Sequence, residues 1–284
     1  MSVSQSEKAK KFRALHAGPG AFIIPNPWDA GSARILASLG FSALATTSAG
    51  FAFSIGRRDG QVTREEALAH CRAIVEASDL PVAADLENCF GDDPKTVAET
   101  IRLAGSTGLV GGSVEDATSD GKIYEHSHAL ERVAAAVESA RALPFPFTLT
   151  ARAENFLQGH ADLDDTIGRL QAFAAAGADV VYAPGLPGLD LIRTVCAAVA
   201  PRPVNVLAGI KGQNFPLADL EAAGARRISL GGSLARAALG ALLRAGREMK
   251  ENGTFTFVDG AAPSAEVNGI LTDRSREAGK RGND

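Results

Sequence analysis

The feature that most constrains the fold is a phrase that repeats along the chain: a short apolar segment, a loop, a helix-period segment and then a glycine. Most of the apolar segments are continuous runs rather than alternating ones, which is typical of parallel strands covered on both faces. They are residues 21–24, 43–47, 82–86, 109–114, 147–152, 180–183, 204–207 and 227–230. Eight such units in 284 residues predict an α/β fold, a closed (β/α)8 TIM barrel, since these barrels commonly occupy roughly 250 residues.

The ends of the helix-period segments carry boundary signals that agree with this pattern. Thr63 and Glu66 have the spacing of a capping box. Gly40, Gly177 and Gly224 each follow a helix-period segment and precede an apolar run. A left-handed residue is wanted at that point, so these glycines predict helix ends.

No linker divides the chain into two domains. We expect a single (β/α)8 barrel catalytic domain over residues 1–263. The segment 264–284 is more polar and charged, and we expect it to form a C-terminal arm, a helical extension that docks around residues 267–271 and frays beyond them.

Composition excludes several classes of function. The net charge is −4 and no block of Lys and Arg stands out, which argues against nucleic-acid binding. No apolar run has the roughly 20 residues of a membrane helix, and the first residues lack the apolar core of a signal peptide. The three cysteines, Cys71, Cys89 and Cys196, lack zinc-ligand spacing and predict reduced thiols in a cytoplasmic protein.

Acidic residues stand at the ends of two neighbouring predicted strands, where a barrel of this kind builds its site. Asp85 and Glu87 are two residues apart, so on a strand both would point to the same side. Glu115 and Asp116 follow the next strand. A divalent cation would relieve the repulsion between such carboxylates, and hard oxygen ligands suit Mg²⁺, with Mn²⁺ as a second candidate. The alternative is a set of solvated loop acids.

The fifth and seventh predicted strands end in further polar residues. Arg152 and Glu154 share one side of the fifth strand end. A guanidinium there could hold a carboxylate or stabilise enolate charge, or it could only pair with neighbouring acids. Asn205 in the seventh strand is a candidate for contact with a ligand.

The first two strand ends offer candidate contacts for a substrate anion. Trp28 and Asp29 follow the first strand, where they could line a pocket, or Trp28 could pack and Asp29 cap a helix. The small-residue run at 47–49, Thr47, Ser48 and Ala49, presents hydroxyl and N–H groups that suit a carboxylate, or it forms a tight loop. Asp59 is either catalytic support or a turn residue.

With these residues in place, the chain resembles the isocitrate lyase/phosphoenolpyruvate mutase superfamily over residues 22–238. The motifs that carry the resemblance are Asn-Pro-Trp-Asp-Ala at 26–30, Thr-Ser-Ala at 47–49, Asp59, Asp-Leu-Glu at 85–87, Glu-Asp at 115–116, Ala-Arg at 151–152 and Asn-Val-Leu-Ala-Gly at 205–209.

The resemblance implies roles for these positions. Asp85 would be the direct Mg²⁺ ligand, and Glu87, Glu115 and Asp59 would hold the water molecules of the metal. Residues 47–49 would grip the substrate carboxylate, Arg152 would bind the oxo acid and stabilise charge, and residues 28–29 would line the pocket. The chemistry implied passes through an enolate of pyruvate or a related oxo acid as a C–C or C–P bond breaks.

Two departures from the family pattern indicate a divergent branch. The lyase branch carries a Lys-Lys-Cys-Gly-His loop whose cysteine is the acid/base, whereas residues 118–125 here contain no cysteine. The acidic motif reads Asp-x-Glu at 85–87 where Asp-x-Asp is usual, and 28–30 read Trp-Asp-Ala where Tyr-Asp-Ala is usual.

We therefore predict an Mg²⁺-dependent lyase or decarboxylase that cleaves a C–C bond of a small 2-oxo or 2-hydroxy dicarboxylate, a reaction that does not need the missing cysteine. The alternatives are a C–P enzyme, either a phosphonopyruvate hydrolase or a phosphonomutase, and a protein that binds a 2-oxo acid without turnover. The resemblance also implies a homo-oligomer, a dimer or a tetramer, in which barrels exchange a C-terminal helix.

Overall fold

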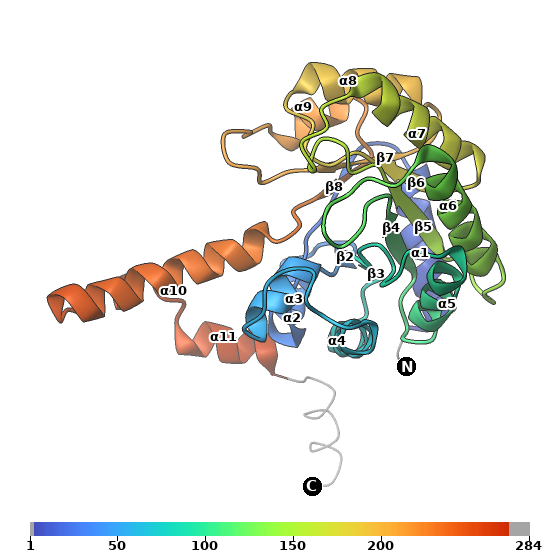
Figure 1. Ribbon diagram of the computed structural model, residues 1–284. Coiled ribbons are helices and arrows are strands. Elements are labelled where there is room, and N and C mark those ends of the chain that lie inside the picture. Colours follow the sequence, from blue (N-terminus) through green and yellow to red (C-terminus); the bar gives the residue numbers. More distant parts are fainter. Residues whose placement is uncertain (1–2, 273–284) are drawn as a thin grey trace, which may run out of the picture.

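Eight parallel strands form a barrel in the computed structural model, which describes residues 3–272 (Figure 1). The strands are β1 (Phe22–Ile24), β2 (Leu44–Ala45), β3 (Val82–Ala84), β4 (Gly111–Glu115), β5 (Thr148–Arg152), β6 (Val180–Tyr182), β7 (Val204–Leu207) and β8 (Arg227–Ser229). Every sequential pair from β2 to β8 is hydrogen-bonded, and β8 returns to β1. Only β1 and β2 lack a ladder, and a hydrogen bond from the Ala45 N–H to the Pro25 carbonyl, 3.1 Å long, bridges that gap. The prediction of a (β/α)8 barrel is confirmed.

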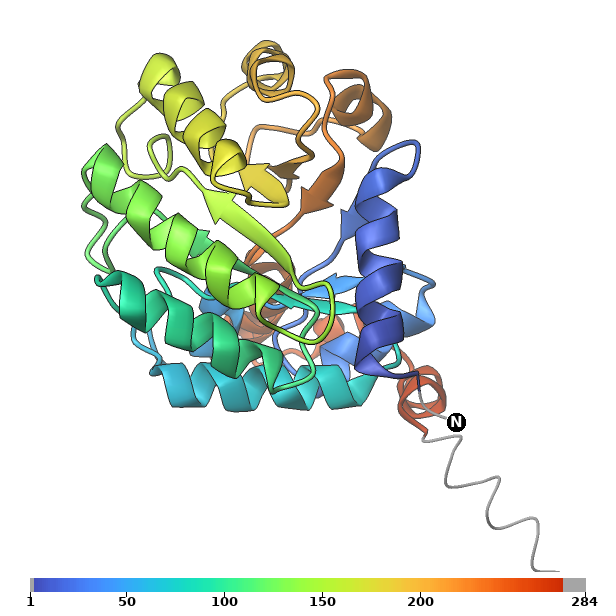
Figure 2. The same ribbon diagram turned by 90° about the vertical axis from the view of Figure 1, so that its right-hand side faces the viewer.

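Helices follow the strands and cover the outside of the barrel (Figure 2). They are α2 (Ala30–Ser38), α3 (Ser48–Ser54), α4 (Arg64–Ala77), α5 (Pro94–Gly105), α6 (His126–Arg141), α7 (Leu163–Ala175), α8 (Leu189–Ala198) and α9 (Leu217–Ala222). The Thr63 hydroxyl and the Glu66 carboxylate form the predicted capping box of α4. Gly40, Gly177 and Gly224 all have positive φ, as their positions at helix ends predict.

The first helix, α1 (Gln5–Ala17), closes the end of the barrel where the strands begin. Its Phe12 is fully buried and packs with Ile24, Ala43 and Val110 in a small cluster inside the barrel. Gly111 makes this approach possible, because a Cβ there would lie 3.0 Å from the Phe12 ring and 2.7 Å from the Thr148 carbonyl oxygen. The lower end of the barrel is therefore sealed by apolar side chains, and only the other end is free to form a site.

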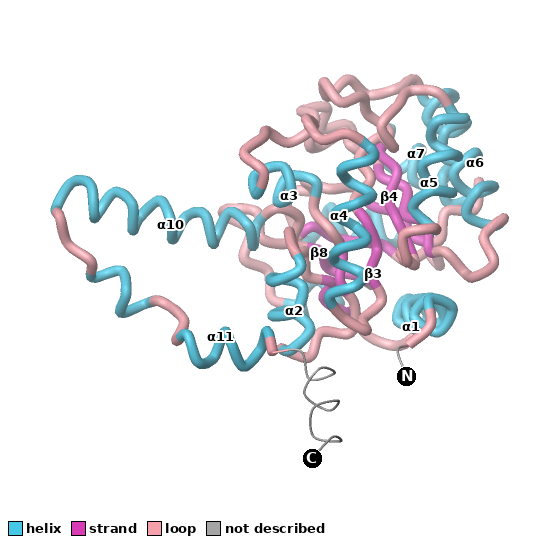
Figure 3. The backbone as a smooth tube through the Cα atoms, turned by 90° about the horizontal axis from the view of Figure 1, so that it is seen from below, coloured by secondary structure: helices cyan, strands magenta, loops and turns pink. Residues whose placement is uncertain are grey.

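The helix after β8 departs from the regular pattern. α10 (Ser233–Asn252) points away from the barrel, and a short 3-10 helix, η1 (Thr256–Gly260), turns the chain back toward α11 (Ser264–Leu271) (Figures 1 and 3). α11 packs against α2, where Arg34 donates a hydrogen bond to the Leu271 carbonyl. The chain thus leaves the barrel at α10, ahead of residue 264, and the predicted fraying of the arm lies outside the described residues.

The end of β3 differs from the sequence prediction, and this strand leads into the acidic residues of the candidate site. β3 stops at Ala84, so Asp85 and Glu87 lie in the loop after the strand, and Glu87 has a φ of 52°. The argument that they share one face of a strand is therefore wrong, although the loop still brings the two carboxylates together, as shown below. None of the helices within residues 3–272 is both long and apolar enough to cross a membrane.

Candidate active site

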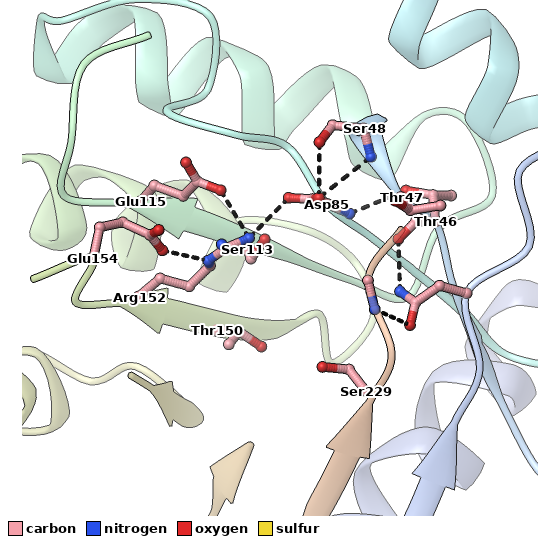
Figure 4. A network of polar contacts seen from close by, with 12 residues as sticks. Thr46, Thr47, Ser48, Asp85, Ser113, Glu115, Thr150, Arg152, Glu154 and Ser229 are labelled. Carbon is pink, nitrogen blue, oxygen red and sulfur yellow. Dashed lines mark hydrogen bonds and ion pairs between the residues drawn. The ribbon is translucent and has the colours of Figure 1, made fainter. Parts of the chain in front are cut away.

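Arg152 occupies the centre of the rim formed by the carboxyl ends of the strands (Figure 4). Its guanidinium lies 3.1 Å from Asp85, 2.7 Å from Glu115 and 2.7 Å from Glu154. The ring of Tyr182 packs beneath it, with the guanidinium carbon 5.0 Å from the ring centroid. Three carboxylates and an aromatic face therefore hold one nearly buried cation in a fixed orientation.

Asp85 is the residue that links the two sides of the rim (Figure 4). One carboxylate oxygen accepts from Arg152, and the other accepts from the backbone N–H and the hydroxyl of Ser48 at 3.3 and 3.1 Å. Its own backbone N–H donates to the Thr46 hydroxyl. Asp85 is thereby aimed at the space above the barrel axis rather than toward bulk solvent.

Glu87 and Asp59 add negative charge beside Asp85. Burial, followed by the charges of Asp85 and Asp59, raises the pKa of Glu87 to about 8. Burial and the Asp85 charge also raise the pKa of Asp59, which approaches from the loop after α3, and the nearby Ser48 side chain partly offsets this rise. These three carboxyl groups are close enough to disfavour one another's ionisation, and Arg152 only partly offsets the effect.

The loop that carries Glu87 is fixed from below by Arg132 of α6. This fully buried side chain donates to the carbonyl groups of Asn88, Gly91 and Asp92. Within the loop, Cys89 and Phe90 have φ values of 61°, and burial raises the pKa of the Cys89 thiol to about 12. Cys89 therefore shapes the loop and is an inert thiol.

The small-residue run forms the start of α3. The Thr47 side chain caps the helix by accepting from the Gly50 N–H, and Ser48 is its first residue. The Ser48 N–H and hydroxyl point into the rim, where they meet Asp85 (Figure 4). Ala49 packs near Gly232 at the start of α10. Ser48 is thus the member of the run that faces the site most directly.

Other sequence candidates lie at different depths. Asn205 is buried and lines the same cavity as Asp85 and Arg152. Asp29 is exposed and caps α2 by accepting from the Ser32 N–H, while Trp28 lies beside it and accepts from His70 through its carbonyl. Neither Trp28 nor Asp29 lines that cavity.

Asp116 pairs with Arg169 at 3.1 Å and accepts from the Glu154 N–H, so it holds the backbone of the rim in place from outside the cavity.

Sequence reasoning missed several residues inside the barrel. Tyr182, Arg227 and Ser229 line the cavity below Arg152. The signal that could have found Arg227 is a charged residue at the start of an otherwise apolar strand. Asn26 was noted only as part of the motif at 26–30, and its amide oxygen accepts from the N–H groups of Leu230 and Gly231, which takes up donors that could otherwise bind an anion.

The arrangement can bind a small anionic carboxylate beside a divalent cation. Ser48 and Arg152 could supply donors to the carboxylate, while Asp85, Glu87, Glu115 and Asp59 could supply hard oxygen ligands to the cation. Arg152 lies where negative charge on an oxo oxygen would be stabilised, because it is oriented by carboxylates and shielded from solvent.

Comparison with known proteins finds a family model, a solved structure and a curated protein that are each similar to most of this chain. The family model described as phosphoenolpyruvate phosphomutase matches residues 12–250. A crystal structure from Burkholderia cenocepacia J2315, provisionally named a lyase/mutase, has a TM-score of 0.92 and 58% identity, covering 95% of this chain and 97% of that chain. An uncharacterized protein of Mycobacterium tuberculosis strain H37Rv is 29% identical, covering 92% of this chain and 96% of that protein.

Some curated relatives have named activities. The 2,3-dimethylmalate lyase of Eubacterium barkeri is 29% identical over 76% of this chain and 77% of that enzyme. Further curated relatives are named 2-methylisocitrate lyase and oxaloacetate decarboxylase.

Proposed function

This chain belongs to the phosphoenolpyruvate phosphomutase family, and we propose that it is an Mg²⁺-dependent carbon–carbon lyase or decarboxylase acting on a small 2-oxo or 2-hydroxy dicarboxylate. Membership confirms the predicted superfamily, an enzyme superfamily of lyases and mutases whose members act on small carboxylates. The observation that carries the proposal is the Arg152 guanidinium, held at the rim by Asp85, Glu115 and Glu154. A fixed, shielded cation at this point suits the developing charge of an enolate.

The donor set fits a hard divalent cation. Within residues 3–272 no three His, Cys, Asp or Glu side chains lie close enough to enclose a metal ion by themselves. Mg²⁺ does not require such a cage, since it commonly keeps several water molecules and binds through one or two carboxylates. Asp85 would bind it directly, and Glu87, Glu115 and Asp59 would hold its water molecules. The raised pKa of Glu87, about 8, is the mark of negative charge that a cation would relieve.

The metal would act as a Lewis acid on substrate oxygens, and Mn²⁺ offers the same chemistry to the same ligands. The protein's own groups would do the rest. The Ser48 N–H and hydroxyl would orient a substrate carboxylate, with Thr47 and Ala49 shaping the start of α3 around it. Arg152 would bind the oxo group and stabilise charge as the C–C bond breaks. Its three carboxylate partners would keep the guanidinium in the required position and orientation.

We also propose that the protein works as a homo-oligomer in which α10 packs on a second copy of this chain. Along and beyond α10 a row of large apolar side chains is exposed; they are Leu239, Leu242, Leu243, Met249, Phe255, Phe257 and Val258. Of these, Leu242 is 65% exposed although it lies on a helix of 20 residues that points away from its own barrel. Several large apolar side chains left exposed on one segment are expected at a subunit interface. The cytoplasmic location stays a prediction, supported by three free, buried cysteines.

Oxalate provides a direct test of the site, because this planar dianion resembles the enolate of pyruvate. Calorimetry should detect oxalate binding to the wild-type protein in Mg²⁺ and not in EDTA. Asp85→Asn should abolish the binding, whereas Glu138→Gln, a change of an exposed acid on α6, should leave it intact. Oxalate binding that is equally strong in EDTA, or that survives Asp85→Asn, would refute the metal-dependent site.

A further inference from the structure

The inside of the barrel is polar below the rim. TIM barrels usually fill this region with branched aliphatic side chains. Here a cavity of about 60 Å³ extends below Asp85 and Arg152, and its walls include Thr150, Tyr182 and Arg227. A void of that size holds several water molecules, or a group as large as a carboxylate.

Arg227 is the cation at the base of this cavity. It is only 7% exposed, and every hydrogen-bond partner of its guanidinium is neutral. Nε donates to the Asn205 amide oxygen at 2.8 Å, and one terminal nitrogen donates to the Thr150 hydroxyl at 2.9 Å. The other terminal nitrogen lies 3.3 Å from His16 Nε2.

His16 is neutral and accepts this last hydrogen bond. Burial and the charge of Arg227 lower the pKa of His16 to about 3. Its Nδ1 lies 2.9 Å from the Phe12 carbonyl, which can only accept, so Nδ1 carries the proton and Nε2 is free to accept from Arg227. Arg227 is therefore held firmly from below and from the side, without any counter-charge.

The two arginines of the cavity differ in this respect. Arg152 contacts three carboxylates, whereas no carboxylate lies within ion-pair distance of Arg227 among residues 3–272. Burial and the Arg152 charge lower the pKa of Arg227 to about 10, which leaves it charged at neutral pH. A buried, uncompensated charge is strongly unfavourable, and an aliphatic side chain would fill this layer without that penalty. Fold stability alone does not account for Arg227.

We propose that this cavity is a second anion subsite, in which Arg227 binds the carboxylate of the substrate that is remote from the reacting bond. This inference rests on the proposed function and assigns the second carboxylate of its dicarboxylate substrate to Arg227. The guanidinium has terminal N–H groups beyond those donated to Thr150 and His16, and it lines the cavity. Tyr182 and Ser229 add neutral hydroxyl groups to the wall, and burial keeps the Tyr182 phenol protonated, with a pKa of about 12.

The geometry also sets the length of that substrate. Asn205 is the register partner of both Tyr182 in β6 and Arg227 in β8, and Tyr182 pairs in turn with Arg152 in β5. These strands bring the two arginines to the wall of one cavity, which His16 and Phe12 close below. Because the cavity measures only about 60 Å³, the proposed subsite calls for a short dicarboxylate, and a long or bulky chain would not fit.

Binding of succinate and butyrate, which share a four-carbon chain and differ by one carboxylate, tests the subsite without any turnover. Calorimetry on the full-length protein, in Mg²⁺ and separately in EDTA, should show that the wild type prefers succinate. In Arg227→Met the Kd for succinate should rise about 10- to 100-fold, the loss expected for a buried charge-assisted contact, and the preference should vanish. Arg226→Met is the matched control, because Arg226 precedes Arg227, carries the same charge and bonds instead to the Gly20 carbonyl.

Circular dichroism establishes that the variants are folded. Arg227→Lys keeps the charge but loses the planar guanidinium with its paired N–H donors, so it should give an intermediate Kd for succinate. If Arg227→Met does not fold, Arg227→Lys carries the test, with a weaker preference for succinate expected. Succinate binding that is unchanged in Arg227→Met or Arg227→Lys, or reduced equally in Arg226→Met, would overturn the subsite. Arg227-dependent succinate binding in a protein that turns over no substrate would keep the subsite and reject the proposed lyase. Turnover of dicarboxylates that does not depend on Arg227 would keep the proposed lyase and reject the subsite.

Discussion

Neutralising Glu87 should stabilise the metal-free protein, and the gain should grow with pH. The folded-state pKa of Glu87 is about 8 because burial and the charges of Asp85 and Asp59 disfavour its ionised form. A carboxyl group whose pKa is raised on folding holds its proton more tightly in the folded chain. Its stabilising contribution is complete below its ordinary pKa of 4.5 and is lost as the pH rises toward 8.

The magnitude follows from that interval. The difference between 4.5 and about 8 corresponds to at most roughly 5 kcal/mol above pH 8. Glu87 retains some contact with solvent, which screens the interaction, so we expect about 1–3 kcal/mol. For a chain of this size that raises the melting temperature of Glu87→Gln by roughly 2–10 °C over the wild type.

Thermal unfolding in EDTA at pH 5 and pH 8.5 measures the effect. Glu87→Gln and wild type should melt at similar temperatures at pH 5 and diverge at pH 8.5, whereas the exposed-site control Glu138→Gln should follow the wild type at both. Saturating Mg²⁺ should stabilise the wild type more than Glu87→Gln. A difference that is the same at both pH values, or a variant less stable than wild type at pH 8.5, would refute the reasoning about crowded carboxylates.

Three further variants probe the rim, its support and the interface. Arg152→Lys should keep the fold but lower kcat by roughly 10²- to 10³-fold, because an ammonium lacks the planar fork, and wild-type kinetics would remove Arg152 from the chemistry. Arg132→Met should lower the free energy of unfolding by about 3 kcal/mol, since three buried carbonyl groups lose their donor, and an unchanged urea midpoint would contradict this. Leu243→Asp should yield a smaller assembly in analytical ultracentrifugation, because a 57% exposed leucine on α10 would no longer pack on a partner; unchanged sedimentation would reject that interface.

The fold could be predicted from the sequence because its signal is repetitive and local. Most strands are marked by continuous apolar runs, and several helix ends carry a cap or a glycine, so the units add up to one architecture. The exact strand ends could not be predicted in this way. β3 stops at Ala84, and the loop that follows is held by Arg132, whose sequence position is far from the loop that it supports.

The candidate site likewise has residues that the sequence predicts and residues that it does not. Asp85, Glu115 and Arg152 stand at strand ends, where barrel topology alone brings them to one rim. Asp29 shows the limit, because a single acidic residue before a helix is compatible with a pocket or a cap, and the structure has it as a cap. Arg227 was missed because its role depends on the absence of a partner carboxylate in three dimensions, which no local pattern reveals.

The most direct test of the central claim is a turnover screen of wild type, Asp85→Asn and Arg152→Lys, read by NMR detection of products. Oxaloacetate, substituted malates, methylisocitrate and phosphonopyruvate would be supplied with Mg²⁺ or with EDTA. We predict that a dicarboxylate is cleaved at a C–C bond by the wild type in Mg²⁺, and that EDTA or Asp85→Asn abolishes the reaction. Consumption of phosphonopyruvate alone would assign a C–P enzyme, and saturable binding without any product would assign a binding protein; either result would contradict the lyase proposed here.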